Sequence, residues 1–174
     1  QVPNGRFTGH VFEGLKEREL LRFQGPFGTF FLRPDSTGPV ILMAGGTGLA
    51  PIKAILEEAF HQGIDRRFHL FWGVRARHDL YLHDQLLGLS HEHANLNYVP
   101  VLSEPAADDS WTGETGWVHE SVLRQFPNLK DLEVYASGPP PMIDAARTAF
   151  AANGLSETRL FYDSFEFGAD VIEH

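Results

Sequence analysis

The stretch VILMAGGTGLAP, residues 40–51, decides the fold class predicted for this chain. Its first five residues are apolar without interruption, which is typical of a strand buried on both faces of a parallel sheet. Three glycines follow within four positions, and Pro51 suits the first turn of a helix. Apolar residues then recur at three- and four-residue steps until Gly63. The stretch therefore predicts a strand, a glycine turn and a helix in direct succession.

The same alternation of strand and helix repeats through the rest of the chain. Patterns of apolar residues predict further strands at 68–73, 96–102, 132–136 and 159–162, and further helices at 79–91, 117–126 and 140–153. Alternating units of this kind predict the α/β class, with a doubly wound, mostly five-stranded parallel sheet and flanking helices. In such folds ligands bind at the carboxyl ends of the strands.

Residues 1–33 have a different pattern. Two short aromatic and aliphatic runs lie within residues 20–32 and are separated by Gly-Pro and Gly, which is typical of a hairpin or a barrel edge. Two strands cannot form a core by themselves. We therefore interpret residues 1–33 as the C-terminal remnant of a second domain and residues 34–174 as the βα domain. The lack of an initiator methionine and the polar opening fit a processed or cut chain.

Composition excludes several classes of partner and cofactor. The 174 residues include 14 Lys and Arg against 23 Asp and Glu, so the formal net charge is −9. This charge repels phosphate backbones and anionic lipid surfaces, so we expect neither a nucleic-acid nor a membrane partner. The chain has no cysteine, which excludes disulfides, thiolate zinc sites and iron–sulfur clusters on it. No apolar run approaches the roughly 18 residues of a membrane span, and we expect a soluble, cytoplasmic protein.

The first candidate site is the glycine turn after residues 40–44. Its candidate ligand-binding residues are Gly45, Gly46, Thr47, Gly48 and Pro51. Bare backbone can approach a ligand closely, and the following helix offers unpaired N–H groups and a positive dipole end, which suits a pyrophosphate. The turn matches neither the G-x-G-x-x-G fingerprint nor the phosphate loop G-x-x-x-x-G-K-[ST]. A plain tight turn is the alternative interpretation.

Two further strand ends carry candidate residues. Ser137, Gly138, Pro139, Pro140 and Met142 form a stiff turn that could present one face to a planar ring, although prolines often just start a helix. At the other strand end stand an aromatic side chain and two cations that could meet an adenosine ribose or its phosphate: Trp72, Gly73, Arg75 and Arg77. A solvated basic turn with Asp79 as helix cap is the alternative there.

Together the three turns, in this order and spacing, resemble the nicotinamide-binding domain of the ferredoxin-NADP reductase superfamily. The resemblance covers nearly the whole chain and is strongest to reductase components of bacterial oxygenases and to related reductases of deoxysugar synthesis. It implies that NAD(P)H binds this chain and that the intact parent protein also carries FAD. It further implies hydride transfer from nicotinamide C4 to flavin N5 and onward electron transfer to an iron–sulfur protein or an oxygenase.

The resemblance also implies roles for particular residues. The turn at 45–48 would hold the pyrophosphate, residues 72–77 would flank the adenosine, and residues 137–142 would cradle the nicotinamide. Ser137 stands where the family often has cysteine beside nicotinamide C4, and we predict it as a catalytic residue together with Glu166, whose segment the family brings towards the flavin. A solvated carboxylate is the alternative for Glu166.

The N-terminal residues fit the same family. Residues 5–8, ending in Thr8, resemble the end of its flavin pyrophosphate segment, and residues 25–30 resemble the last strand of its flavin barrel. Residues 1–33 would then be a remnant of that barrel. The flavin-holding Arg-x-Tyr-Ser segment of the family would lie further upstream, so the chain alone is expected to be half of a reductase and to need the flavin domain of its parent chain as a partner.

Some alternatives stay open at this stage. Arg75 and Arg77 favour tolerance of a 2′-phosphate, yet similar family members use NADH, so the nucleotide is written NAD(P)H. His91 and His93 are two positions apart, which on a helix separates their rings by about 200°, so we expect no metal site. A non-catalytic nucleotide-binding or partner-docking module is the alternative function.

Overall fold

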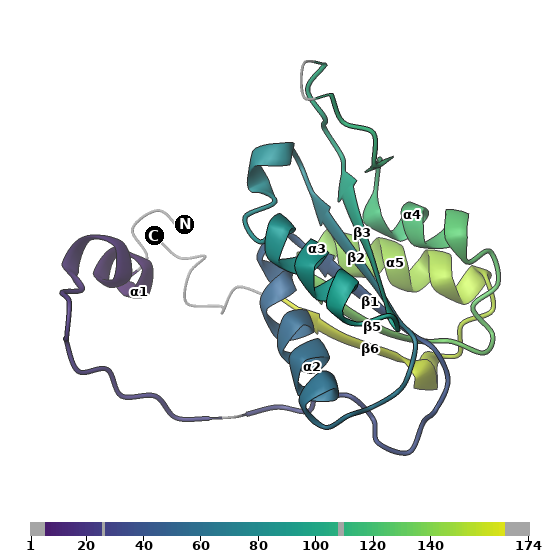
Figure 1. Ribbon diagram of the computed structural model, residues 1–174, viewed down its shortest axis with the longest axis horizontal. Helices are drawn as coiled ribbons and strands as arrows, with labels where there is room; N and C mark the ends of the chain where they lie inside the picture. The colour runs from purple at the N-terminus through teal and green to yellow at the C-terminus, as the bar shows by residue number, and fades with distance from the viewer. Residues whose placement is uncertain (1–5, 26, 108–109, 166–174) are drawn as a thin grey trace.

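A computed structural model describes residues 6–25, 27–107 and 110–165 and shows one parallel sheet flanked by helices (Figure 1). Six strands pair in the order β4-β3-β2-β1-β5-β6, and every pair is parallel. Their bounds are β1 Val40–Gly45, β2 Phe68–Val74, β3 Leu96–Leu102, β4 Glu114–Thr115, β5 Glu133–Gly138 and β6 Leu160–Ser164. The predicted α/β class with a parallel sheet is confirmed, and the sheet has one short strand more than predicted.

The order of the strands places a topological switch point beside β1. From β1 the chain winds outward through β2, β3 and β4, and it then crosses to the other side of β1 to form β5 and β6. All six residues of β1 are buried, as an uninterrupted apolar run requires in the centre of a sheet. In open α/β sheets ligands bind outside the carboxyl ends of the strands at such a point.

Two helices cover each face of the sheet. The helices α2, Leu49–His61, and α3, His83–Glu92, pack on one face over Leu42, Leu70 and Tyr135. On the opposite face α4, Val118–Gln125, and α5, Pro140–Ala152, pack over alternate residues of the same strands. Because side chains alternate across a strand, β1 contributes to both cores, which explains why it is apolar throughout.

One predicted helix boundary differs from the structure. The helix predicted from Asp79 begins only at His83, because residues 77–79 form a separate 3₁₀ turn, η3 (Arg77–Asp79). The Ala76 N–H donates to Asp79 Oδ2 at 3.1 Å, so the carboxylate closes this turn rather than capping α3. The alternative interpretation of Asp79 as the helix cap is therefore wrong: the N-cap of α3 is Leu82, and Asp79 lies in the short turn η3 after β2.

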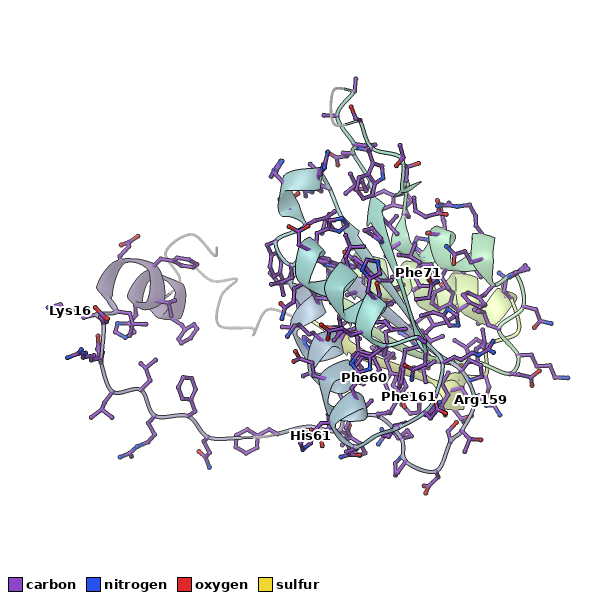
Figure 2. All side chains as sticks on the ribbon, viewed as in Figure 1. Lys16, Phe60, His61, Phe71, Arg159 and Phe161 are labelled. Atoms are coloured by element: carbon purple, nitrogen blue, oxygen red, sulfur yellow. The ribbon has the colours of Figure 1, made fainter. Side chains whose placement is uncertain are left out.

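The N-terminal segment does not form the predicted strands. It begins with α1, Arg6–Gly9, and a π-helical turn, η1 (His10–Gly14), and no strand occurs among the described residues before Val40. Leu20 and Phe23 are 97% and 80% exposed. Strands need a partner for their backbone hydrogen bonds, and nothing in the described chain pairs with residues 20–32. Figure 1 shows this segment, in purple, apart from the sheet, and Figure 2 shows Lys16 there.

Among the described residues, no helix is both long enough and apolar enough to cross a bilayer.

Candidate functional site

The three predicted turns meet at the carboxyl ends of β1, β2 and β5. Gly45 pairs with Gly73 of β2 on one side, and Ala44 pairs with Ser137 of β5 on the other. The candidate residues therefore come from three neighbouring strands and lie around the switch point. We call this region, residues 45–51, 72–77 and 137–142, the crest.

Gly48 brings the first turn into direct contact with β5. A Cβ placed on Gly48 would lie 2.6 Å from the carbonyl carbon of Ser137 and 2.9 Å from the nitrogen of Gly138. Those are backbone atoms of a paired strand and cannot move aside. Glycine is needed at this position because two backbones touch, and the contact fixes the turn on its neighbour.

Gly46 is needed for a different reason. Its φ is +53°, in the left-handed region that favours glycine, and a Cβ added there would meet no atom within 4 Å. Neighbouring Thr47 is exposed. Glycine is therefore required at position 46 by the backbone φ angle and not by a steric contact. The space beside Gly46 is open to a ligand.

The helix after this turn offers an anion site. The 13-residue α2 has Gly48 at its N-cap, no side-chain cap and no acidic residue in its first turn, which contains half-buried Pro51. The positive end of the helix dipole is thus not neutralised by a carboxylate of the helix. A diphosphate is the kind of group that such a terminus beside bare glycine backbone binds.

Trp72 contributes differently from its predicted contact with adenosine. Its side chain is fully buried, and its Nε1–H donates to the carbonyl of Gly46 at 2.9 Å. The Trp72 side chain therefore supports the glycine turn through this hydrogen bond, and it has no exposed surface that a ligand could contact.

Tyr81 is the exposed aromatic residue on this side of the crest. It lies edge-on to Trp72, with ring centroids 5.1 Å apart, and is 55% exposed. Burial of part of the ring raises the pKa of its hydroxyl, which stays a neutral hydrogen-bond donor. Tyr81 is not among the site residues predicted from the sequence. Its position shortly after the two arginines of the same turn was the available signal.

Gly73, Arg75 and Arg77 have separate roles in the structure. A Cβ on Gly73 would lie 2.7 Å from the Cβ of Val118, so this glycine allows α4 to pack against β2. Arg75 and Arg77 are exposed, and the Arg75 carbonyl accepts the Glu104 N–H at 2.8 Å. The two arginines thus lie on the surface after β2, whereas Gly73 serves helix packing.

Ser137 is the most unusual polar residue of the crest. It has no exposed surface, and its Oγ has no hydrogen-bond partner among the described residues. Leaving a buried hydroxyl unpaired costs about 1–3 kcal/mol. A polar group of a ligand that reached Ser137 would remove this cost, which fits a carboxamide-bearing ring, but the contact requires a neighbouring group to move away.

Met142 fills the space between the two glycine turns. A Cβ on Gly138 would lie 2.7 Å from Met142 Cε and 3.2 Å from the Cα of Gly45, and Gly45 also packs against the Met142 sulfur. Pro139 is the N-cap of α5 and accepts the Met142 N–H at 3.0 Å, while Pro140 is the first residue of that helix. An unbranched thioether adapts its shape readily, so Met142 is a movable packing element at the crest.

Two predicted site residues lie away from this region. Thr8 is part of α1, which Figure 1 shows apart from the sheet, and its side chain is not described. Glu166 lies outside the described residues. In addition, the part of the chain that the structure describes contains no group of three or more His, Asp or Glu residues that could hold a metal ion.

Other surface depressions lie elsewhere. One is lined by residues of β3 and β4 and contains the ion pair of Arg124 Nη2 with Glu114 Oε2 at 2.6 Å. The hydrogen bond from Arg124 lowers the pKa of Glu114. A second lies between α5 and β6 and includes Arg147 and Tyr162. Neither depression includes the glycine turns.

Comparison with known proteins decides the family. Residues 42–148 match the sequence family described as the oxidoreductase NAD-binding domain. The chain belongs to this family. The match begins inside β1 and ends within α5, so it contains the whole crest of the NAD-binding domain.

Curated relatives of this NAD-binding domain are reductases. Over 165 residues it is 43% identical to the CDP-6-deoxy-L-threo-D-glycero-4-hexulose-3-dehydrase reductase of Yersinia pestis, covering 95% of this chain and 49% of that protein. It is 35% identical to the phenol 2-monooxygenase reductase component DmpP of Pseudomonas sp. strain CF600, covering 97% and 48%. The predicted resemblance to deoxysugar and oxygenase reductases is confirmed, and the chain spans about half the length of these relatives.

Solved structures agree with this result. The cytochrome P450 reductase GcoB of Amycolatopsis is 30% identical, with a TM-score of 0.75 over 91% of this chain and 49% of that one. The ferredoxin reductase of carbazole 1,9a-dioxygenase is 28% identical, with a TM-score of 0.78 over 95% and 49%. Both are reductases, and this chain covers about half of each.

Proposed function

We propose that this NAD-binding domain holds NAD(P)H at the crest for hydride transfer to FAD in a flavin-dependent reductase. Electrons would then pass to an iron–sulfur protein or an oxygenase in a cytoplasmic reductase. The names of its relatives support this, since they include a phenol 2-monooxygenase reductase component and a ferredoxin–NAD(P)(+) reductase component. The observation that carries the proposal is the uncapped start of α2 beside a bare glycine turn that touches the end of β5 at the switch point.

The residues of the chain have complementary tasks in this proposal. When bound, NAD(P)H supplies the hydride from its nicotinamide ring. The turn at 45–48 and the start of α2 bind the diphosphate, and Trp72 holds that turn in place. Tyr81, Arg75 and Arg77 flank the adenosine. The turn after β5 orients the nicotinamide, with Ser137 as the polar group at its edge.

The exposed apolar side chains of the N-terminal segment support an adjoining flavin-binding part in this proposal. Most of the large apolar side chains that are exposed in the described chain lie within residues 7–31, among them Phe7, Phe12, Leu20 and Phe23. Such a run of exposed apolar groups needs a protein surface to cover it. We assign residues 1–33 to a flavin-binding barrel and residues 34–174 to the NAD-binding domain. Thr8 and Glu166 are assigned to the flavin side of the same proposal.

The proposal is tested by a matched pair of glycine variants in a nucleotide titration. Gly46 and Gly63 have φ values of +53° and +68°, and a Cβ on either would meet no atom within 4 Å. Alanine at either site is therefore expected to destabilise the chain by about 1 kcal/mol. Only Gly46→Ala should weaken binding of NADH or NADPH, by about tenfold or more in isothermal calorimetry, because only that turn faces the ligand.

The other outcomes separate the alternatives. Equal weakening by Gly46→Ala and Gly63→Ala would place the nucleotide elsewhere, and the absence of any heat with either nucleotide would contradict the proposed function. If the nucleotide binds but the parent protein with FAD does not oxidise NADH or NADPH at 340 nm, the non-catalytic module is favoured. The same titration compares NADH with NADPH directly.

Ser137 provides a test with opposite effects on stability and function. Ser137→Ala removes an unpaired buried hydroxyl, so the free chain is expected to gain about 1 kcal/mol, or a rise in Tm of about 2–4 °C. Hydride transfer in the flavin-containing protein is expected to slow, because the polar contact at the ring edge is lost. Thermal unfolding and single-turnover flavin reduction measure the two effects. A fall in Tm would show that Ser137 has a partner in solution.

A further inference from the structure

The segment from Phe30 to Pro39, here called the linker, is bound to the sheet although it contains no helix or strand. It joins residues 1–29 to β1. Phe30 and Leu32 pack against the hydrophobic core on the α2 side of the sheet. Val40, the residue after the linker, donates its N–H to the carbonyl of Arg67 at 2.8 Å. Segments between domains are usually flexible. The linker instead has two separate attachments to the NAD-binding domain.

The first attachment is built around Arg33 and Tyr135. The Arg33 N–H donates to the hydroxyl of Tyr135 at 2.9 Å, although Tyr135 is a fully buried residue of β5. The Arg33 guanidinium lies 4.3 Å from the ring centroid of Phe31 and 4.7 Å from that of Phe161 in β6. Phe161 in turn stacks on Tyr135 at 4.8 Å. The main chain of Arg33 is thus bound to β5, and its side chain contacts β6.

The second attachment is Arg66, just before β2. Its guanidinium is 5% exposed, pairs with Glu133 Oε2 at 2.7 Å, and donates through Nε to the carbonyl of Gly38 at 2.7 Å. It also approaches Ser36 Oγ at 3.4 Å. A buried ion pair needs such additional hydrogen bonds to compensate its desolvation. The linker supplies them, so its position is tied to the amino ends of β1, β2 and β5.

We propose that Arg33 and Tyr135 form a clamp that sets the orientation of the N-terminal flavin-binding part relative to the crest. The inference rests on the proposed function. A small rotation of the backbone at Arg33 moves the residues before it, which lead to the flavin-binding part. Loosening the clamp therefore displaces the flavin relative to the nicotinamide. Transfer between two reacting atoms needs them about 3–3.5 Å apart, and a 1 Å displacement can slow it about 10²-fold. Arg33 and Tyr135 are positioning residues in this scheme.

The test uses the flavin-containing reductase that includes this chain, with Arg33→Ala and Tyr135→Phe. Tyr135→Phe keeps the stacked ring and removes only the acceptor of the Arg33 N–H. Arg159→Ala is the control. Arg159 is an exposed arginine just before β6, near Phe161 (Figure 2), and its side chain donates to the carbonyl of Lys130 rather than to the linker. Stopped-flow reduction of the flavin at saturating NADH gives the rate constant and the dissociation constant separately.

We expect Arg33→Ala to lower the reduction rate constant about tenfold and Tyr135→Phe about threefold, with the dissociation constant for NADH within twofold of wild type. Arg159→Ala should change neither. In the chain alone, hydrogen exchange of the linker amides should become faster in both clamp variants and stay unchanged in the control. This second readout does not depend on bound flavin.

The failures of the two proposals are distinguishable. If wild type reduces its flavin and both clamp variants do so at the wild-type rate, the clamp is overturned while the proposed function stands. A loss of NADH affinity instead of rate would also overturn it. If wild type neither binds NADH nor reduces flavin, the proposed function fails and the clamp with it. Where Arg33→Ala does not fold, Tyr135→Phe alone carries the result.

Discussion

Alanine at position 48 is expected to destabilise the chain by about 3 kcal/mol or more and to abolish measurable nucleotide binding. Overpacking usually costs about 1–3 kcal/mol, and this site lies at the upper end because the added Cβ meets the backbone of Ser137 and Gly138. Gly48 itself has φ −59°, which alanine adopts freely, so the effect is purely steric. Binding is lost because the turn must leave β5 to make room.

Thermal unfolding followed by circular dichroism, with a parallel NADH titration, measures both effects. A loss of 3 kcal/mol corresponds to a fall in Tm of about 6–12 °C for a chain of this size. Gly88→Ala is the control, because Gly88 lies inside α3 and a Cβ there meets no atom within 4 Å. Alanine there should stabilise the helix by about 0.5–1 kcal/mol. Wild-type stability and affinity in Gly48→Ala would contradict the described contact between the turn and β5.

The second large effect is expected from Arg66→Met. This change leaves the carboxylate of Glu133, which is 7% exposed, without its cationic partner, and it removes the donor to Gly38 in the linker. Breaking a buried ion pair from one side costs about 3–5 kcal/mol. The free energy of unfolding from urea titration should fall by that amount.

A double variant separates the charge from the packing. Arg66→Met combined with Glu133→Leu removes both charges, and apolar replacements of a buried pair are often neutral. We expect it to recover most of the loss and to remain below wild type by about 1–2 kcal/mol, since the linker hydrogen bonds are still missing. Arg124→Met, which breaks the partly exposed pair with Glu114, should cost less than about 1 kcal/mol. A similar cost for Arg66→Met and Arg124→Met would contradict the burial of the first pair.

The helices and strands that were predicted correctly are those whose formation depends on residues close together in the sequence. Residues 40–45 are apolar on both faces of the strand, which is typical of a central strand covered on both sides. The glycines at the end of this strand predict the turn at the crest. The same reasoning failed for residues 20–32. Their apolar pattern indicates strands, but a strand forms only where a second backbone accepts its hydrogen bonds, and that partner cannot be read from the segment itself.

The candidate site shows the same division. Trp72 was predicted to contact adenosine because it ends a strand beside two arginines, whereas in the structure its side chain is fully buried and bonds to Gly46. Gly46 and Gly48 look equivalent in the sequence. In the structure Gly46 is required by its positive φ angle, whereas Gly48 is required because its backbone contacts that of Ser137. The attachments of the linker were not anticipated, because Arg33, Arg66 and Tyr135 are far apart in the chain.

The sequence by itself therefore determined the class of fold and the end of the sheet at which the candidate turns lie. These follow from the period of apolar residues and from glycine and proline positions, which act within a few residues. The family was indicated by the resemblance of the three turns and is shown by the match of residues 42–148. Only the tertiary structure decided which turns touch, which crest residues are buried and where the linker is bound. Those properties depend on contacts between residues distant in the chain, whose distances are set by the packing of whole strands and helices.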